Sequence, residues 1–268
     1  MMTPKVSLLM VLGILWSLSA TAQDTLTVMS YNIYHGEQAY EEGKGNLDDV
    51  SALIREVDPD FVALQEVDEM TGRLAALNNG KAFSLVDSLA KLTDMTGYFG
   101  KAINYEGGSY GEGLLSKKPL KSQKVMLPIP KGGEKRAALY VEGETSSGQP
   151  FIFAGTHLCH QYEENRLAQA GAVNSHFEDE KNVLIAGDFN FTPDSDSYRA
   201  IQKQWLDAAV IYNQPPEMTY SFEHPERRID YLFLSKKSNW EVLDVKAIKR
   251  DYSDHLPLVA RVVIHPTD

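Results

Sequence analysis

The sequence predicts an α/β protein whose buried strands end in reactive side chains. Three runs of four apolar residues each lead into polar ones, at residues 61–64, 151–154 and 183–186. Glu66, His157, Asp188 and Asn190 follow these runs within four residues. A run that is apolar at every position indicates a strand covered on both faces, and such strands present functional side chains at their carboxyl ends. We therefore expect these four side chains to converge.

Two further runs have the opposite layout. Asp230 opens the apolar residues 231–234, and Asp254-His255 precedes residues 256–260. These strands would start at the same edge and run antiparallel to the first three. Carboxylates, an amide and two imidazoles gathered at one sheet edge are the ligands of a hard divalent cation with acid and base groups beside it.

The helices are predicted from stripes of apolar residues. Residues 46–57 carry such a stripe, with Asn46 as the N-cap, and Asp58-Pro59 ends the helix. A second helix carries Leu85, Leu89 and Leu92 on one face and ends near Gly97. Weaker helix patterns cover residues 163–177 and 195–205, and strand patterns cover residues 98–105, 110–116, 136–143 and 240–248.

Six short segments resemble the ordered motifs of the endonuclease/exonuclease/phosphatase superfamily, which includes DNase I, repair nucleases, inositol polyphosphate phosphatases and neutral sphingomyelinases. They are Met29-Ser30-Tyr31-Asn32-Ile33, Leu64-Gln65-Glu66-Val67, Thr156-His157-Leu158, Gly187-Asp188-Phe189-Asn190, Arg228-Ile229-Asp230-Tyr231 and Ser253-Asp254-His255-Leu256-Pro257. One motif alone is weak, whereas all six in order are strong evidence. The resemblance implies a four-layer α-β-β-α sandwich of two mixed, mostly antiparallel sheets, spanning about residues 25–265.

The chain has the features of an exported single domain. Lys5 precedes an apolar stretch, and Ala20-Thr21-Ala22 offers a cleavage site, so residues 1–22 are predicted to be a signal peptide and residues 23–268 the domain. An uncleaved anchor is the less favoured alternative, because the apolar stretch is short. The processed N-terminus has no cysteine for a bacterial lipid anchor. We expect a secreted or periplasmic monomer without stable membrane insertion.

The charge balance bears on the substrate. The formal net charge is −11 and becomes −12 once the signal peptide with Lys5 is removed. Nucleic-acid binding usually requires a basic surface, and here lysine and arginine occur only in small groups. A nucleic-acid substrate is therefore possible but not preferred.

Three residues are predicted metal ligands. The resemblance makes Glu66 the principal ligand, the alternative being a salt bridge to an arginine. Asn32 would offer an amide oxygen and Asp254 a second carboxylate. Such oxygen-rich sites suit Mg²⁺, with Mn²⁺ or Ca²⁺ as alternatives, and disfavour zinc.

The resemblance also assigns catalytic roles. His255, oriented by Asp230, would act on the attacking water or on charge in the transition state, since imidazole titrates near neutrality. Asp188 and Asn190 would position the water and hold a phosphoryl oxygen.

His157 distinguishes this chain from the repair nucleases, which carry tyrosine there. In DNase I the equivalent histidine pairs with a glutamate of a Tyr-x-Glu segment, and Tyr110-Gly111-Glu112 is similar. Glu112 is therefore the predicted partner of His157, which would contact the phosphate or protonate the leaving oxygen. Arg136 is a predicted phosphate ligand, with an exposed strand-end arginine as the alternative.

The resulting prediction is a secreted, divalent-metal-dependent phosphoesterase acting on a small or lipid-headgroup substrate. A DNase I-like endonuclease is the alternative. An inactive binding module is a remote third possibility, because every expected catalytic residue is present.

Overall fold

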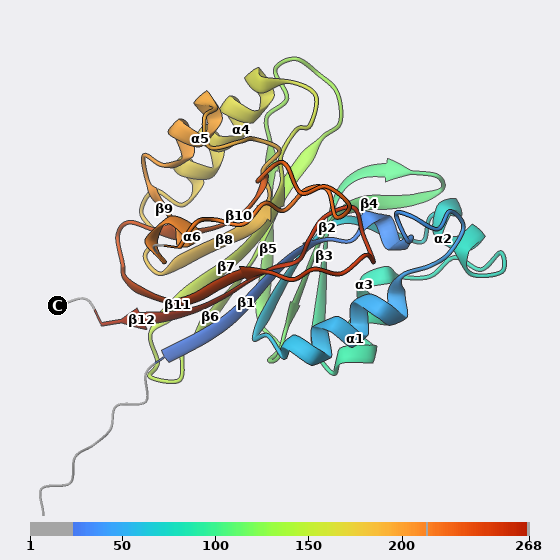
Figure 1. The fold of residues 1–268 in the computed structure, drawn as a ribbon, viewed down its shortest axis with the longest axis horizontal. Helices are drawn as coiled ribbons and strands as arrows, with labels where there is room; N and C mark the ends of the chain where they lie inside the picture. Colours follow the sequence, from blue (N-terminus) through green and yellow to red (C-terminus); the bar gives the residue numbers. More distant parts are fainter. Residues whose placement is uncertain (1–23, 213, 267–268) are drawn as a thin grey trace, which may run out of the picture.

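The computed structural model describes residues 24–212 and 214–266 and consists of two six-stranded sheets packed against each other (Figure 1). The predicted signal peptide, residues 1–22, lies outside the described residues. No helix within the described residues is long and apolar enough to cross a membrane.

The first sheet has the strand order β11-β12-β1-β2-β4-β3. Its strands are β1 Asp24–Asn32, β2 Phe61–Glu69, β3 Thr96–Tyr105, β4 Gly108–Ser116, β11 Asn239–Ala247 and β12 Leu258–His265. The central pair β1 and β2 is parallel, and every other pairing is antiparallel. The helix α1, Leu47–Val57, makes the crossover between the two parallel strands.

The second sheet has the same plan, with the order β5-β6-β7-β8-β10-β9. Its strands are β5 Lys121–Leu127, β6 Arg136–Glu144, β7 Pro150–His157, β8 Val183–Asp188, β9 Trp205–Asp207 and β10 Asp230–Ser235. Only β7 and β8 are parallel, and the crossover helix between them is α4, Glu163–His176.

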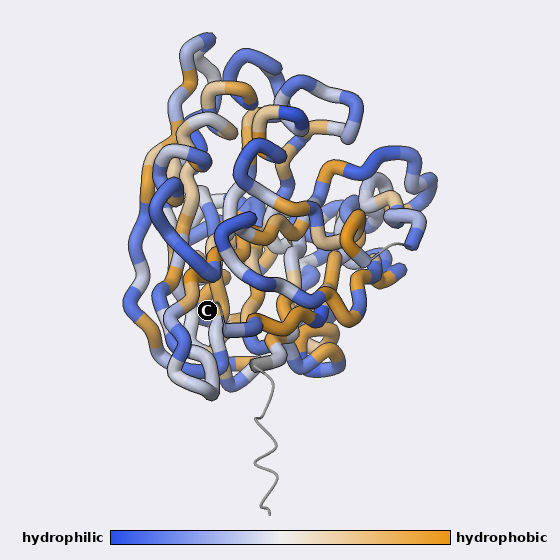
Figure 2. The backbone as a smooth tube through the Cα atoms, turned by 90° about the vertical axis from the view of Figure 1, so that its left-hand side faces the viewer, coloured by the Kyte–Doolittle hydropathy of each residue, from blue (hydrophilic) through white to orange (hydrophobic). Residues whose placement is uncertain are grey.

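Three apolar clusters hold four layers together. One fills the space between the sheets and includes Phe61, Phe153 and Leu232. A second lies between the first sheet and the helices α1 and α3, Leu85–Thr93, and a third lies between the second sheet and α4 with α5, Asp196–Ile201. Hydrophobic segments are concentrated inside and hydrophilic ones mostly at the periphery (Figure 2). The predicted four-layer sandwich of mixed, mostly antiparallel sheets is therefore confirmed.

Several predicted elements differ from the structure. The helix predicted for residues 195–205 ends at Ile201, because Trp205 begins the short strand β9 and buries its ring in the core. Leu92 of the predicted apolar stripe is 39% exposed, whereas Leu85 and Leu89 are buried. The elements that the sequence patterns did not predict are β5, β9, α2 Gly72–Leu77, α6 Ala208–Ile211 and the 3-10 turn η1 Tyr34–Gly36.

Strand register brings the predicted site residues together. His157 at the end of β7 pairs with Asp188 at the end of β8, and Asp188 pairs with Asp230 at the start of β10. In the first sheet, Asn32 at the end of β1 pairs with Gln65, one residue before Glu66. The carboxyl ends of the parallel strands in both sheets thus face one site.

Candidate active site

A pocket of about 380 Å³ opens at these strand ends. It is lined by Glu66, Tyr110, Glu134, Arg136, His157, His160, Asp188, Asn190, Tyr220, Arg227, Ile229, Asp254 and His255. Seven of the predicted site residues are in this lining. The other three, Asn32, Glu112 and Asp230, are buried.

A β-bulge directs Glu66 into the pocket. Between Leu64 and Val67 the register of β2 against β4 shifts, so that two residues of β2 face one of β4. Glu66 has a left-handed φ of 58°, a conformation that side chains other than glycine adopt at a cost. Burial favours the neutral carboxyl, but the contacts with His35 and Asn32 oppose it, and the pKa of Glu66 lies well below its usual range. Glu66 is therefore an ionised carboxylate on the pocket wall.

The amide nitrogen of Asn32, and not its oxygen, faces the carboxylates of Glu66 and Asp188. Asn32 Nδ2 donates to Glu66 Oε1 at 3.1 Å and to Asp188 Oδ2 at 3.2 Å, while Asn32 Oδ1 accepts from the backbone N–H of Tyr34. This orientation differs from the prediction that the amide oxygen faces a metal ion. In this structure Asn32 instead links the two carboxylates across the sheet interface.

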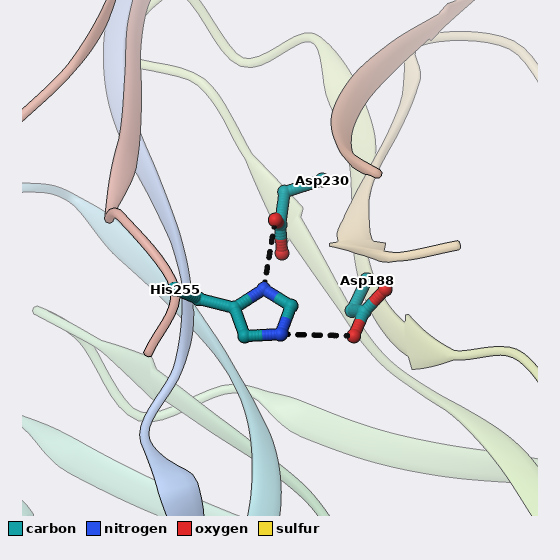
Figure 3. A group of neighbouring side chains, drawn as sticks. All are labelled: Asp188, Asp230 and His255. Carbon is teal, nitrogen blue, oxygen red and sulfur yellow. Dashed lines mark hydrogen bonds and ion pairs between the residues drawn. The ribbon is translucent and has the colours of Figure 1, made fainter. Parts of the chain in front are cut away.

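His255 lies between two aspartates (Figure 3). Its Nδ1 is 2.9 Å from Asp230 Oδ2, and its Nε2 is 3.6 Å from Asp188 Oδ2. Burial lowers the pKa of His255, but the negative charges of Asp230 and Asp188 outweigh it and raise the pKa to about 10. The predicted contact between Asp230 and His255 is therefore present.

Asp188 is the centre of the site. Its Oδ2 lies 3.2 Å from Asn32 Nδ2 and 3.4 Å from His157 Nε2, and its Oδ1 accepts from the backbone N–H of Asn190 at 2.9 Å. Burial raises the pKa of the Asp188 carboxyl to about 7, with His255 opposing the shift and Asp230 adding to it. Asn190 lines the pocket and donates through Nδ2 to the carbonyl oxygen of Leu158.

His157 is fixed by Arg136. Arg136 Nη1 lies 3.0 Å from His157 Nδ1, and because a guanidinium has only donors, Nδ1 must accept and Nε2 must carry the proton. Burial and the charge of Arg136 hold the pKa of His157 well below its usual range. The imidazole is therefore neutral and points an N–H toward Asp188, 3.4 Å away.

The predicted pair of Glu112 and His157 does not form. Glu112 Oε2 is buried without a hydrogen-bond partner within the described residues, and Arg136 occupies the His157 nitrogen that the glutamate would need. Burial raises the pKa of Glu112 well above its usual range, which favours a neutral carboxyl. Glu112 is thus buried outside the pocket lining and does not contact His157.

Arg136 is buried, contrary to the alternative of an exposed strand end. It lines the pocket, contacts His157 through Nη1 and His160 Nδ1 through Nη2 at 3.2 Å, and forms an ion pair with Glu134. Its Nε has no partner within the described part of the chain. A guanidinium fixed in this way presents its charge to an anion without further ordering.

The donor set fits a hard divalent cation. Burial raises the pKa of Asp254, and the nearby negative charge of Glu66 raises it further, so these carboxylates repel each other where no cation lies between them. A bound cation would offset this repulsion, and carboxylate oxygens are the ligands that Mg²⁺ and Mn²⁺ prefer. Asp188, Asp230 and His255 form a second buried group whose ligand atoms lie within 4.8 Å of one another. In this group, however, His255 Nδ1 already pairs with Asp230.

Several residues in the pocket or in contact with its lining carry no motif signal. His35, in η1, lies 3.7 Å from Glu66 Oε2, and His160 contacts Arg136. The Tyr220 ring lies 4.8 Å from that of His255, and the Arg227 guanidinium lies 5.7 Å from the Tyr220 ring. The only sequence signal for the two histidines is their nearness to Asn32 and His157, and Tyr220 and Arg227 come from a loop whose composition marks it as a rim segment.

Comparison with known proteins shows the family of this chain. The family model described as "Endonuclease/Exonuclease/phosphatase family" matches residues 29–255, and the chain belongs to this family. The family comprises phosphoester-hydrolysing enzymes, generally dependent on a divalent metal, and this protein is a phosphoesterase of that class.

Individual relatives are more distant. The uncharacterized protein YbhP of Escherichia coli K12 is 25% identical over 249 residues, which cover 90% of this chain and 98% of the relative. A solved structure of a functionally unknown conserved protein from Enterococcus faecalis has a TM-score of 0.73 at 21% identity, covering 90% of this chain and 100% of its own. A mannosyl-6-phosphatase of Bacteroides thetaiotaomicron has a TM-score of 0.65 at 20% identity, covering 89% and 99%.

Proposed function

We propose that this protein uses a divalent cation, Mg²⁺ or Mn²⁺, to hydrolyse a small or lipid-headgroup phosphoester by in-line attack of water. The observation that carries the proposal is the convergence of Glu66, Asp188 and His255, from both sheets, on a pocket that also contains Arg136. Phosphoryl transfer requires neutralisation of the phosphoryl oxygens, an oriented water and help for the leaving oxygen. The pocket has a group suited to each of these tasks.

Glu66 and Asp254 would hold the cation, which supplies Lewis-acid neutralisation of a phosphoryl oxygen when bound. Asn32 would keep the Glu66 carboxylate in place through its amide N–H. Arg136 adds a fixed positive charge to the pocket, beside His157 and His160.

The water would be oriented by Asp188 and His255. His255 is fixed by Asp230, and its Nε2 lies 3.6 Å from Asp188 Oδ2, so both groups can contact one water molecule. His157 carries its proton on Nε2 in a neutral ring, which suits a hydrogen bond to a phosphoryl oxygen better than protonation of the leaving group. We assign His157 and Asn190 to phosphate binding.

We also propose that the protein is exported as a monomer to the periplasm or the medium. The support is the pattern of residues 1–22, a charged residue followed by an apolar stretch and a small-residue cleavage site. Expression of the full chain, followed by fractionation and mass spectrometry of its N-terminus, tests this. A mature chain that begins at Gln23 supports export, and an intact Met1 in the cytoplasm contradicts it.

A DNase I-like endonuclease is the second candidate, favoured by the histidine at position 157 and the Tyr110-Gly111-Glu112 segment. Against it stand the net charge of −11 and the occupation of His157 Nδ1 by Arg136. One structural neighbour is a mannosyl-6-phosphatase by name, in keeping with the first candidate.

A substrate panel distinguishes the two candidates. Purified protein with Mg²⁺ is assayed on plasmid DNA, RNA, sugar phosphates, inositol phosphates and phospholipids, with the His255→Ala variant as a control for contaminating enzymes. We expect turnover of a small or headgroup phosphoester that the variant lacks. Turnover confined to plasmid DNA contradicts the preferred substrate and favours the endonuclease.

A further inference from the structure

A second cavity, of about 120 Å³, adjoins the active-site pocket, and we call it the side cavity. It shares Glu66, Tyr110 and Glu134 with the pocket and is completed by Arg73, Ile103 and Tyr105. Because Glu66 belongs to both cavities, a substrate whose phosphate lies beside Glu66 can place its attached group in the side cavity.

Arg73 is held rigidly on the wall of the side cavity. Its Nε and Nη2 donate to the two carboxylate oxygens of Asp68 at 2.9 and 2.8 Å, and its guanidinium lies 4.8 Å from the centre of the Tyr105 ring. Asp68 is buried. Arg73 Nη1 makes no hydrogen bond or ion pair within residues 24–212 and 214–266. A donor fixed in this way loses little conformational entropy when it binds a ligand.

The lining excludes several kinds of ligand. Ile103 is the only aliphatic side chain of the side cavity, so the cavity offers little to an acyl chain. The rings of Tyr105 and Tyr110 are tilted by 56° with centroids 6.3 Å apart, and Arg73 covers one face of Tyr105. This arrangement is not the parallel slot in which a flat nucleobase stacks.

Hydroxyl groups suit this lining. A hydroxyl both donates and accepts, so a ring bearing several of them can accept from Arg73, donate to the Glu134 carboxylate and pair with a phenol. We propose that the side cavity binds the polyhydroxylated ring of a sugar phosphate, whose phosphate lies in the active-site pocket. This rests on the proposed phosphoesterase function and narrows its substrate from phosphoesters in general to those of sugar-like rings.

The test measures competition and direct binding. Hydrolysis of bis(p-nitrophenyl) phosphate with Mg²⁺ is inhibited with methyl phosphate, glycerol phosphate, a hexose phosphate, an inositol monophosphate, a nucleoside monophosphate and a short-chain lysophosphatidate. Calorimetry measures the binding of the same compounds. We expect the ring phosphates to bind about tenfold more tightly than methyl phosphate, which cannot reach the side cavity.

Two variants test the assigned residues. Tyr105→Ala and Arg73→Lys should reduce the ratio of ring-phosphate affinity to methyl-phosphate affinity from about ten toward one, a loss worth about 1.4 kcal/mol. Tyr212→Ala, which alters a tyrosine outside both cavities, should keep the wild-type ratio. Thermal melts verify that each variant is folded, and the two side-cavity variants serve as independent checks.

The outcomes separate this inference from the proposed function. Absence of metal-dependent hydrolysis of both bis(p-nitrophenyl) phosphate and p-nitrophenyl phosphate contradicts the proposed function, whereas calorimetry would still report on the side cavity. Ring phosphates that bind no better than methyl phosphate, or unchanged ratios in both variants, overturn the inference. Binding of the nucleotide tighter than that of the hexose phosphate, or binding of the lysophosphatidate as tight as that of the hexose phosphate, would also overturn it where Tyr105→Ala abolishes it, because the cavity would then recognise a base or an acyl chain.

Discussion

At the scale of single residues, the two histidines of the site have opposite electrostatic surroundings. His255 lies between two carboxylates, which raise its pKa, whereas His157 lies against Arg136, which together with burial lowers the pKa of its imidazole. One site therefore holds two imidazoles whose pKa values are shifted in opposite directions. Such a difference between two groups of one type usually marks different chemical roles.

His255→Ala and His255→Asn should reduce kcat/KM for bis(p-nitrophenyl) phosphate by about a hundredfold to ten-thousandfold, the usual effect of removing a positioned acid or base. His265→Ala is the matched control, because this histidine pairs with Glu241 on the protein surface. Steady-state kinetics with circular dichroism of each variant makes the measurement. Either His255 variant within a few-fold of wild type would contradict its assignment.

Glu112 gives a prediction about stability and pH. Its folded-state pKa is raised by burial, so between the unfolded and folded pKa values only the unfolded state ionises, and stability falls as the pH rises. Glu112→Gln removes this penalty and keeps the shape of the side chain. We expect the variant to gain on the order of 1 kcal/mol over wild type at pH 8 and little at pH 4. Urea denaturation at both pH values tests this, and a loss of stability at pH 8 would show that the glutamate is ionised and paired.

At the scale of elements, a β-bulge and a hydrogen-bonded connection between two loops determine the geometry of the site. The bulge in β2 directs Glu66 into the pocket. Asn46, just before α1, does not cap that helix with its side chain but donates through Nδ2 to the carbonyl oxygens of Ile33, Glu37 and Tyr252. The loop after Asn32 is thereby joined to the loop before Asp254.

Asn46→Ala should destabilise the fold by about 1 to 3 kcal/mol, because buried carbonyl groups lose their donor. It should also lower kcat, because the loops that carry Asn32 and Asp254 are no longer joined. Asn78→Ala is the control, since Asn78 is exposed and its side chain donates to the carbonyl oxygen of Lys81. Unfolding curves and steady-state kinetics make the comparison. The same free energy of unfolding and the same kcat in both variants would contradict this role for Asn46.

Sequence patterns predicted those elements that have a strong periodicity. The runs 61–64, 151–154 and 183–186, which lead to Glu66, His157 and Asp188, are apolar at every position, so these strands and the polar residues that follow the runs could be predicted directly. The edge strand β5, Lys121–Leu127, carries several exposed residues and lacks such a signal. The end of α5 could not be predicted either, because an apolar residue such as Trp205 fits the pattern of a helix and that of a strand equally well.

The residues of the site could be predicted from the sequence, but only some of the contacts between them. Motif positions indicated that His255 and Asp230 would meet, and they do. Arg136, and not Glu112, contacts His157. This contact depends on how far the buried Arg136 side chain extends from β6, which a pattern of residue types does not reveal. The orientation of the Asn32 amide depends on the Tyr34 N–H, which a pattern of residue types does not reveal.

At the scale of the whole molecule, the acidic balance limits what the pocket can hold. The net charge is −11, and the positive charges of the pocket, Arg136 and Arg227, are local. A duplex would have to approach an acidic surface, whereas a small phosphoester needs only the pocket itself.

Any cleavage of plasmid DNA should therefore be slow and should decrease steeply with added salt, as expected for binding through phosphate contacts at the surface. Hydrolysis of a small phosphoester should change little, because its contacts are local and partly desolvated. The measurement is kcat/KM on plasmid DNA and on bis(p-nitrophenyl) phosphate at low and at physiological ionic strength. Fast nicking that tolerates salt would reverse the order of the two candidate substrates.

Metal dependence tests the central assignment most directly, since Glu66 and Asp254 are assigned to a cation. Hydrolysis of bis(p-nitrophenyl) phosphate is followed in excess EDTA and after restoration with Mg²⁺, Mn²⁺, Ca²⁺ or Zn²⁺, for wild type and for Glu66→Gln. We predict that wild-type activity disappears in EDTA and returns with Mg²⁺ or Mn²⁺, and that Glu66→Gln stays inactive with each metal. Undiminished hydrolysis by the wild-type protein in EDTA would contradict the assignment of Glu66 and Asp254 to a catalytic cation.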